Sequence, residues 1–246
     1  MQKKIQSRSI ANALRRNILS LFEFEHFDQS MPRVRLETAR AFNTSITKRI
    51  LDLAIAIPAF VILLPFMVLI GIIIRLDSKG PALFKHKRVG LNGKIFDMYK
   101  FRSMYQNVTD AIHKQHIDAY AHGKINENEG VKLKWDPRVT RVGRIIRSTS
   151  IDELPQLINV IKGDMSLVGP RPVPIYEADY YNLWQSERLG TLPGMTGLWQ
   201  VSGRSSVSFE EMIRLDIRYI RNQSLWLNIL ILIKTIPAIL SRKGAG

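Results

Sequence analysis

The longest feature of the hydrophobic pattern is an uninterrupted apolar run over residues 53–74, LAIAIPAFVILLPFMVLIGIII, which contains no charged residue. A run of this length is long enough to cross a bilayer as a helix. Pro58 and Pro65 lie inside it, and each removes a backbone donor and disfavours a straight helix. A buried core helix is the alternative, but so long an uncharged run argues against it. The pattern therefore predicts a proline-kinked membrane helix over residues 47–76.

Basic residues flank this run on both sides. Lys48 and Arg49 precede it, and a second group follows it, formed by Arg75, Lys79, Lys85, Lys87 and Arg88. The positive-inside rule favours the cytoplasmic side for both flanks, which a helix that crosses the membrane cannot satisfy. We therefore expect a re-entrant helix, bent near Pro65, that enters and leaves through one leaflet.

The remaining patterns are shorter and predict a small α/β domain, mostly helical, over residues 77–246. The Asn92-Gly93 step between two basic and apolar runs predicts a β-hairpin within residues 82–104. Residues 198–201 predict a short strand or turn, and residues 209–221 an amphipathic helix. Residues 225–240 are apolar but interrupted, which favours a helix lying on the membrane surface over a buried core helix.

Charge and composition limit the classes of binding partner that the chain is expected to have. The formal net charge is +15 over 246 residues, which suits a polyanion such as nucleic acid, anionic lipid or a phosphorylated substrate. The sequence shows no recognition-helix or stacking-sheet motif, so a nucleic-acid partner is disfavoured. There are no cysteines, which excludes disulfides and thiolate metal sites. The basic N-terminal extension, residues 1–46, is read equally well as an amphipathic helix or as a solvated tail.

Candidate chemistry is concentrated in residues 148–172, STSIDELPQLINVIKGDMSLVGPRP. Ser150 followed by Glu153 predicts a capping box at the start of a helix, with Asp152 in its first turn. Such a position favours ionised carboxylates, which can act as nucleophiles toward phosphorus. Lys100 and Arg102 lie on one face of an expected strand and would both point at a phosphate. The simpler alternative is that both carboxylates only cap the helix and pair with arginines.

Several motifs together resemble the bacterial sugar transferases, the monotopic phosphoglycosyl transferases that begin exopolysaccharide and glycan assembly. The resemblance covers roughly residues 47–242 and rests on KRILD, DSKGPALFKHKRVG, YKFRSM, RSTSIDELPQLINVIKGDMSLVGPRP and LPGMTGLWQVSGR, in that order. The closing KTIPAILSR is similar to the exopolysaccharide galactosyl- or glucosyl-phosphate transferases. Relatives often carry Ser-Pro at the membrane kink, where this chain has Leu64-Pro65. The depth and angle of the bend are therefore left open.

The resemblance implies transfer of a hexose 1-phosphate from a UDP-sugar to undecaprenyl phosphate, with release of UMP, at the cytoplasmic face of the bacterial inner membrane. It makes residues 77–246 the catalytic domain and Asp152 the nucleophile that forms a covalent phosphosugar intermediate. Glu153 completes the dyad, and both carboxylates would hold Mg²⁺. Residues in the substrate- and phosphate-binding motifs are Lys100, Arg102, Arg147, Pro170, Arg171, Pro172, Gln200 and Arg204.

A non-catalytic membrane anchor for an assembly complex stays open as an alternative, in which the carboxylate pair is only structural. Sugar selectivity depends on pocket shape, and the sequence does not distinguish galactose from glucose or another sugar. It also leaves open whether the chain forms a homo-oligomer.

Overall fold

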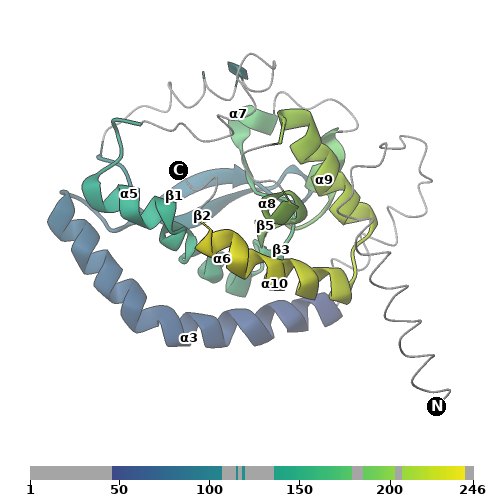
Figure 1. Cartoon of the computed structure of the whole chain (residues 1–246), viewed down its shortest axis with the longest axis horizontal. Helices are drawn as coiled ribbons and strands as arrows, with labels where there is room; N and C mark the ends of the chain where they lie inside the picture. Colours follow the sequence, from purple (N-terminus) through teal and green to yellow (C-terminus); the bar gives the residue numbers. More distant parts are fainter. Residues whose placement is uncertain are drawn as a thin grey trace.

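The computed structural model describes residues 46–106, 115, 118, 119, 136–178, 185–202 and 207–241. A single long helix, α3 (Ile46–Asp77), runs along one side of the described part, and the strands and shorter helices lie on its other side (Figure 1). The helix is continuous through Pro58 and Pro65 and curves around the domain in Figure 1. The predicted membrane segment is therefore one curved helix.

The domain contains two small sheets. β1 (Leu83–Val89) and β2 (Ile95–Phe101) form the predicted antiparallel hairpin, and β4 (Val173–Pro174) pairs with the other edge of β1. The hairpin turn is the 3-10 helix η1 (Leu91–Gly93). Asn92 and Gly93 adopt positive φ there, at 53° and 79°, which explains why Asn-Gly signals the turn. β3 (Ser166–Val168) and β5 (Gly194–Thr196) form a separate parallel pair.

Short helices connect the strands and support the two sheets. In chain order they are α5 (Arg141–Ser148), η3 (Ile151–Glu153), α6 (Gln156–Lys162), α7 (Ile175–Ala178), η4 (Gln185–Gly190) and α8 (Leu198–Ser202). The prediction of a strand or turn at residues 198–201 is wrong, because this segment is α8. Leu198 and Trp199 are buried in the main core, and a short apolar run between glycines fits a buried helix as well as a strand.

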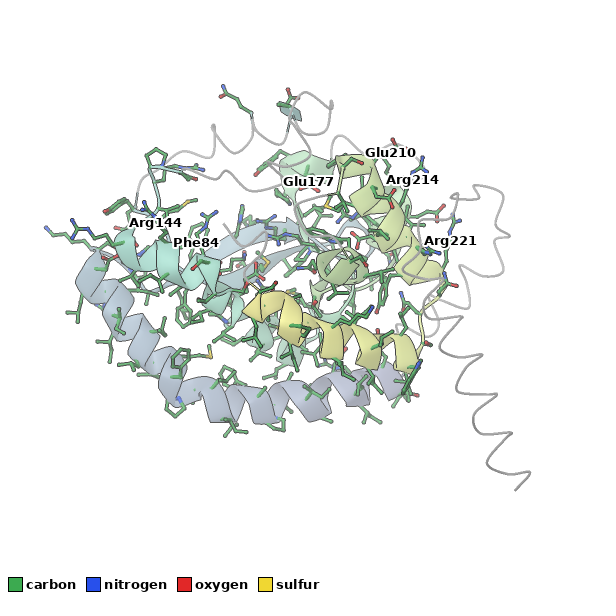
Figure 2. The ribbon with its side chains drawn as sticks, in the orientation of Figure 1. Phe84, Arg144, Glu177, Glu210, Arg214 and Arg221 are labelled. Atoms are coloured by element: carbon green, nitrogen blue, oxygen red, sulfur yellow. The ribbon has the colours of Figure 1, made fainter. Side chains whose placement is uncertain are left out.

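The two C-terminal helices have the predicted extents, α9 (Phe209–Arg221) and α10 (Leu225–Leu240). The inner face of α9 supplies much of the core, including Ile213 and Ile217, which are both 0% exposed. Glu210, Arg214 and Arg221 project from the other side of this helix (Figure 2), and Arg214 pairs with Glu210 at 2.6 Å. Ser224 caps the start of α10, because its hydroxyl accepts a hydrogen bond from the backbone N–H of Leu227.

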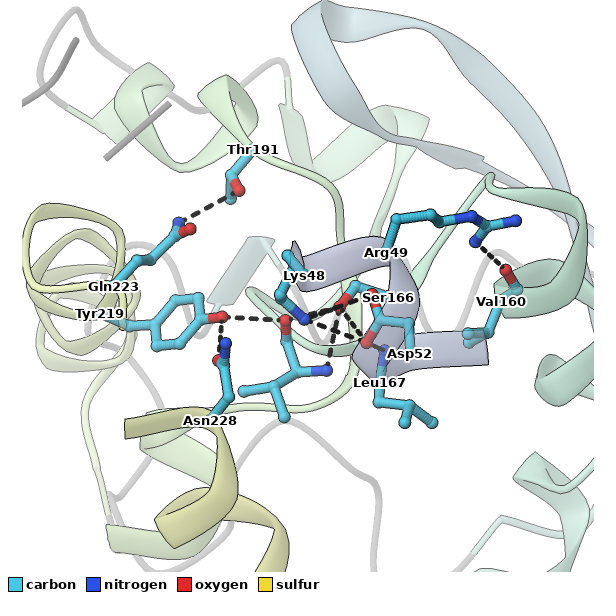
Figure 3. A network of polar contacts seen from close by, with 11 residues as sticks. Lys48, Arg49, Asp52, Val160, Ser166, Leu167, Thr191, Tyr219, Gln223 and Asn228 are labelled. Carbon is cyan, nitrogen blue, oxygen red and sulfur yellow. Dashed lines mark hydrogen bonds and ion pairs between the residues drawn. The ribbon is translucent and has the colours of Figure 1, made fainter. Parts of the chain in front are cut away.

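A buried polar network fixes the first turns of α3 to the sheet (Figure 3). The carboxylate of Asp52 accepts hydrogen bonds from Lys48 Nζ, Ser166 Oγ and the backbone N–H of Leu167, each at 3.1 Å. Lys48 also donates to Ser166 Oγ. Arg49 donates to the carbonyls of Val160 and Ile161 at the end of α6, at 2.6 and 2.7 Å. A buried ion pair needs such additional hydrogen bonds to offset its desolvation.

The other end of α3 is attached to the same domain. Asp77 accepts a hydrogen bond from the backbone N–H of Val142, near the start of α5, at 3.3 Å. Arg102 donates to the carbonyls of Lys79 and Ser78, the latter at 2.6 Å, and to that of Ile74 at 3.4 Å. These carbonyl groups lie in the last turn of α3 and just after it. Both ends of the apolar helix are thus held by one folded domain.

We predict that Asp52→Asn destabilises the protein by about 3–5 kcal/mol, because it leaves the buried Lys48 ammonium without its counter-charge. The asparagine keeps an oxygen for Ser166 and Leu167, so the test isolates the charge. The measurement is thermal unfolding in detergent micelles. Asp97→Asn is the control, because Asp97 pairs with Lys87 at 4.0 Å on the surface and should cost less than about 1 kcal/mol.

The double variant Lys48→Met/Asp52→Asn removes both charges and should recover part of the loss. Two results would show that the ion pair does not hold this end of α3. One is an Asp52→Asn variant with the melting temperature of the wild type, and the other is a double variant that melts no higher than Asp52→Asn.

Candidate active site

The adjacent carboxylates Asp152 and Glu153 lie in η3, a single 3-10 turn between α5 and α6. Ser150 precedes the turn in the left-handed conformation, with φ 59° and ψ 14°, and its side chain makes no cap hydrogen bond. The predicted capping box is therefore wrong. α6 begins after Pro155, which lacks the N–H that a helix start leaves unpaired. This left-handed residue separates α5 from the turn that carries both carboxylates.

Lys100 of β2 brings a positive charge to both carboxylates. Its Nζ lies 2.8 Å from Glu153 Oε1 and 3.8 Å from Asp152 Oδ2. Asp152 is only 6% exposed, and Lys100 is mostly buried as well. Charges in such surroundings are screened less than at the surface, so the ammonium is a strong counter-charge for two adjacent anions.

Arg171 approaches from the Gly-Pro-Arg-Pro turn that follows β3. Its Nη2 lies 3.8 Å from Glu153 Oε1. Two buried arginines hold the backbone of this turn, because Arg188 donates to the Arg171 carbonyl and Arg88 to the Pro172 carbonyl, each at 3.4 Å. The guanidinium of Arg171 is therefore presented by a braced turn, which suits bidentate recognition of phosphate.

A small pocket that is partly open to solvent lies between these groups. Its lining residues come from β2, η3, α6, the Gly-Pro-Arg-Pro turn, β5 and α8, and they are Met98, Lys100, Glu153, Gln156, Arg171, Pro172, Gly194, Met195 and Gln200. The wall combines two cations and a carboxylate with uncharged amides and two methionines. This arrangement can hold a phosphate group beside a neutral polar group.

Comparison with known proteins identifies the family. The sequence model of the bacterial sugar transferases matches residues 43–242. The chain belongs to this family. It is 42% identical over 220 residues to the undecaprenyl-phosphate galactose phosphotransferase of Salmonella typhimurium. The matched region covers 89% of the chain and 46% of that protein.

Two other relatives match over more of their own length. The exopolysaccharide production protein ExoY of Sinorhizobium fredii is 40% identical over 203 residues, covering 81% of the chain and 88% of the relative. The UDP-glucose:undecaprenyl-phosphate glucose-1-phosphate transferase of Caulobacter vibrioides is 38% identical over 225 residues, covering 87% of the chain and 74% of the relative. The chain thus spans less than half of its Salmonella relative and most of these two.

Most site residues expected in this transferase-family chain lie in or beside the pocket. Lys100, Glu153, Arg171, Pro172 and Gln200 line it, and the side chain of Asp152 lies beside that of Lys100. Pro170 lies just behind, where its carbonyl accepts a hydrogen bond from the Gly194 N–H at 2.8 Å. Arg204 lies outside the described residues.

Arg102 does not face the pocket as expected. It follows the last residue of β2 and its guanidinium caps the end of α3 instead. The expectation assumed that the strand continues past Phe101, but the chain leaves β2 there and strand alternation no longer applies. Arg147 is placed on α5 near Asp152, whose charge raises the pKa of this arginine while burial, the larger effect, lowers it.

Sequence reasoning missed Met98, Gln156, Gly194 and Met195, which all line the pocket. Gln156 had a usable signal, because it follows Asp152 by four residues at the start of a helix. Gly194 is required by close packing, since a Cβ at this position would lie 2.1 Å from the backbone nitrogen of Gly169. The parallel pairing of β3 and β5 that creates this contact could not be read from the sequence.

A second buried charge cluster supports the Arg171 turn from behind. Arg188 is 2% exposed and pairs with Asp216 at 2.6 Å and with Glu177 at 3.3 Å. Glu177 lies on α7 and Asp216 on α9, so Arg188 links these two helices. Burial raises the pKa of Asp216 to about 7, although Arg188 opposes this effect. Arg188 supplies one positive charge to two buried carboxyl groups, so burial still favours the protonated form of Asp216.

We predict that the stability of the wild type falls between about pH 4 and pH 7 through Asp216. The unfolded chain releases this proton near its usual pKa of 3.8, whereas the folded chain keeps it to about pH 7. The folded state therefore binds more protons in this range, so raising the pH lowers the free energy of unfolding, by at most about 4 kcal/mol.

Melting temperatures in detergent micelles measure this effect between about pH 5 and pH 8. Asp216→Asn removes the titration and should flatten this part of the profile. Parallel pH profiles for the wild type and the variant would contradict the prediction.

Proposed function

We propose that the chain transfers a hexose 1-phosphate from a UDP-sugar to undecaprenyl phosphate and releases UMP, as the first step of exopolysaccharide or glycan assembly. The observation that carries the proposal is the joint position of Glu153, Lys100 and Arg171 around one pocket, with Asp152 alongside, in a bacterial sugar transferase chain. The names of relatives from Salmonella and Caulobacter, which specify undecaprenyl-phosphate sugar phosphotransfer, support the choice of substrates.

Asp152 is the proposed nucleophile. A carboxylate oxygen attacks the phosphorus that bears the sugar, an aspartyl phosphosugar forms, and the bond to the UMP oxygen breaks so that UMP leaves with the electron pair. A phosphate oxygen of undecaprenyl phosphate then attacks the same phosphorus. The bond to Asp152 breaks, which restores the carboxylate and gives the lipid diphosphosugar.

The neighbouring cations neutralise charge during both steps. Lys100, 2.8 Å from Glu153 and 3.8 Å from Asp152, reduces the repulsion between these carboxylates and an incoming diphosphate. Arg171 offers a planar pair of donors to phosphate oxygens. Arg147, on α5, adds a further positive charge near Asp152.

Mg²⁺ is the proposed metal, held by Asp152 and Glu153 together with phosphate oxygens of the substrate. The described residues contain no group of three or more histidine, aspartate or glutamate side chains that would hold a metal alone. This donor set fits magnesium, which is usually bound by one or two carboxylates plus substrate phosphates and water. When bound, the ion supplies charge neutralisation at the transferred phosphoryl group.

The apolar surface supports a membrane location. α3 is long and apolar enough to cross a bilayer, and only 11% of its most apolar 18-residue stretch is buried against the rest of the described chain. α10 adds an apolar face of large exposed side chains, formed by Trp226, Ile229, Ile233, Ile236 and Leu240. Since the domain binds both ends of α3, a helix that enters and returns through one leaflet is favoured over one that spans the bilayer. The charged flanks favour the cytoplasmic face of the bacterial inner membrane.

We expect Asp152→Asn to lower UMP release from a UDP-sugar by on the order of 10³-fold or more, because an amide cannot form the phosphosugar intermediate. The assay contains Mg²⁺ and undecaprenyl phosphate in detergent, and chelation with EDTA should remove wild-type activity as well. Asp97→Asn is the matched control, since this carboxyl is on the surface of β2 and should leave the rate unchanged.

Intact mass measurement after incubation with donor alone tests the intermediate directly. The wild type should gain the mass of one hexose phosphate and the variant should not. Normal turnover by Asp152→Asn would overturn the assignment of the nucleophile, and EDTA-resistant turnover would overturn the metal.

Single-cysteine labelling tests the membrane arrangement, because the chain contains no cysteine of its own. We expect Ile46→Cys and Lys79→Cys, at exposed positions on either side of the apolar run, to resist a membrane-impermeant maleimide in intact cells. Both should react after permeabilisation. Reaction of one of them from outside, with the other protected, would show that α3 crosses the bilayer. Arg40, a possible third labelling position, lies outside the described residues.

A further inference from the structure

The pocket wall has a charged part and an uncharged part. Lys100, Glu153 and Arg171 form the charged part, and the amides of Gln156 and Gln200 belong to the uncharged part. The proposed chemistry uses only the first group. We propose that Gln156 and Gln200 bind hydroxyl groups of the sugar that is transferred and thereby select among UDP-sugars. This inference rests on the proposed function and adds to it the residues that recognise the sugar.

Gln200 carries an acceptor in need of a donor. Its Oε1 is buried and has no hydrogen-bond partner within the described part of the chain. A buried polar atom without a partner costs free energy, and such atoms at the wall of a pocket are usually satisfied by a ligand or by water. Gln200 lies on α8, which is packed into the main core through Leu198, so the position of its backbone is fixed.

Gln156 is the second amide and is close to the reacting group along the chain. It is the first residue of α6 and follows Asp152 by four positions. It is 3% exposed, yet it lines the pocket, and among the described residues the structure gives its side chain no hydrogen bond. A glutamine buried at this position is free to offer both a donor and an acceptor to a ligand.

The chemistry of an amide oxygen favours a hydroxyl over a phosphate. Ionised phosphate oxygens only accept hydrogen bonds, and so does Gln200 Oε1, so the two cannot satisfy each other. A sugar hydroxyl both donates and accepts, and a carboxamide can do the same. The apolar side chains of Met98 and Met195 in the same wall suit the C–H surface of a sugar ring.

The location of the pocket favours the sugar over uracil, whose N–H could also donate to Gln200. The sugar is joined through a single oxygen to the phosphorus that Asp152 attacks under the proposed mechanism, whereas uracil lies beyond a second phosphate and a ribose. A group beside Glu153 and Gln156 is therefore the sugar.

The test compares hydroxyl recognition before and after removal of each amide. UMP release by the full chain is measured with a panel of UDP-hexoses, and then with the 2-, 3-, 4- and 6-deoxy analogues of the best donor. We expect the wild type to disfavour at least one deoxy analogue by about 10–100-fold in kcat/KM, as for loss of one or two hydrogen bonds. Gln156→Met and Gln200→Met keep side-chain volume and should reduce that ratio to within about 3-fold.

Gln223→Met is the matched control. The Oε1 of Gln223 is likewise buried without a partner among the described residues, and its Nε2 donates to Thr191 at 3.2 Å (Figure 3), but it does not line the pocket. This variant should keep the wild-type ratio between hexose and deoxy analogue, even where its stability falls. A ratio is insensitive to the amount of folded protein, so it separates recognition from structural support.

Three results would overturn the inference. Pocket variants that slow all donors equally, with an unchanged ratio, would give the glutamines a structural role only. Variants that instead lose discrimination against an N3-methyluracil donor would show that they read the base. A wild type that releases no UMP from any UDP-sugar would overturn the proposed function itself, and the sugar assignment with it.

Discussion

The structure depends on how a long apolar helix is fixed to a polar domain, and Asp52 makes that attachment. Its carboxylate binds Lys48 within α3 and Ser166 and Leu167 on β3. β3 ends at Val168, and Arg171 follows three residues later. The same buried anion that holds the helix therefore also fixes the strand that leads to Arg171, the side chain proposed to bind phosphate. The position of the pocket relative to α3 follows from this short connection.

Positive charge is arranged in two layers, one in the wall of the pocket and one behind it. Lys100 faces the carboxylates directly, and Arg88 and Arg188 hold the backbone of the Arg171 turn. Burial lowers the pKa of Arg88 to about 10, with the charge of Arg171 as the next cause. Packing three guanidinium groups so closely costs free energy unless anions compensate. Glu177 pairs with Arg188, and Asp216 adds a second negative charge only once it loses its proton near pH 7. The inner carboxyls thus allow a strongly positive wall to exist inside the fold.

The features that could be predicted from the sequence are those set by local periodicity or by a single turn. The apolar run of α3, the Asn92 turn of the hairpin and the extents of α9 and α10 are of this kind. The errors concern positions where the chain changes direction. Ser150 adopts a left-handed conformation and its side chain forms no cap, and Arg102 turns away because β2 ends one residue earlier.

For the predicted pocket residues, the sequence indicated which residues matter but not that they come together. Motifs identified Lys100, Glu153 and Arg171, but their convergence depends on contacts between β2, η3 and the turn after β3, which are far apart in the sequence. Gln156 could have been inferred from its spacing to Asp152. The buried pairs of Arg188 with Glu177 and Asp216 could not, because no periodic pattern links residues at these separations.

The proposed function asks one site to serve two substrates of opposite character. A UDP-sugar is soluble and highly charged, whereas undecaprenyl phosphate has a long apolar chain. Lys100 and Arg171 stand in the wall of one pocket, beside the carboxylates of Asp152 and Glu153. Through a covalent aspartyl phosphosugar, UMP would depart before the lipid phosphate enters, so these two cations would serve each phosphate in turn. The proposed covalent route therefore needs a single set of cations, whereas simultaneous binding of both phosphates would need two.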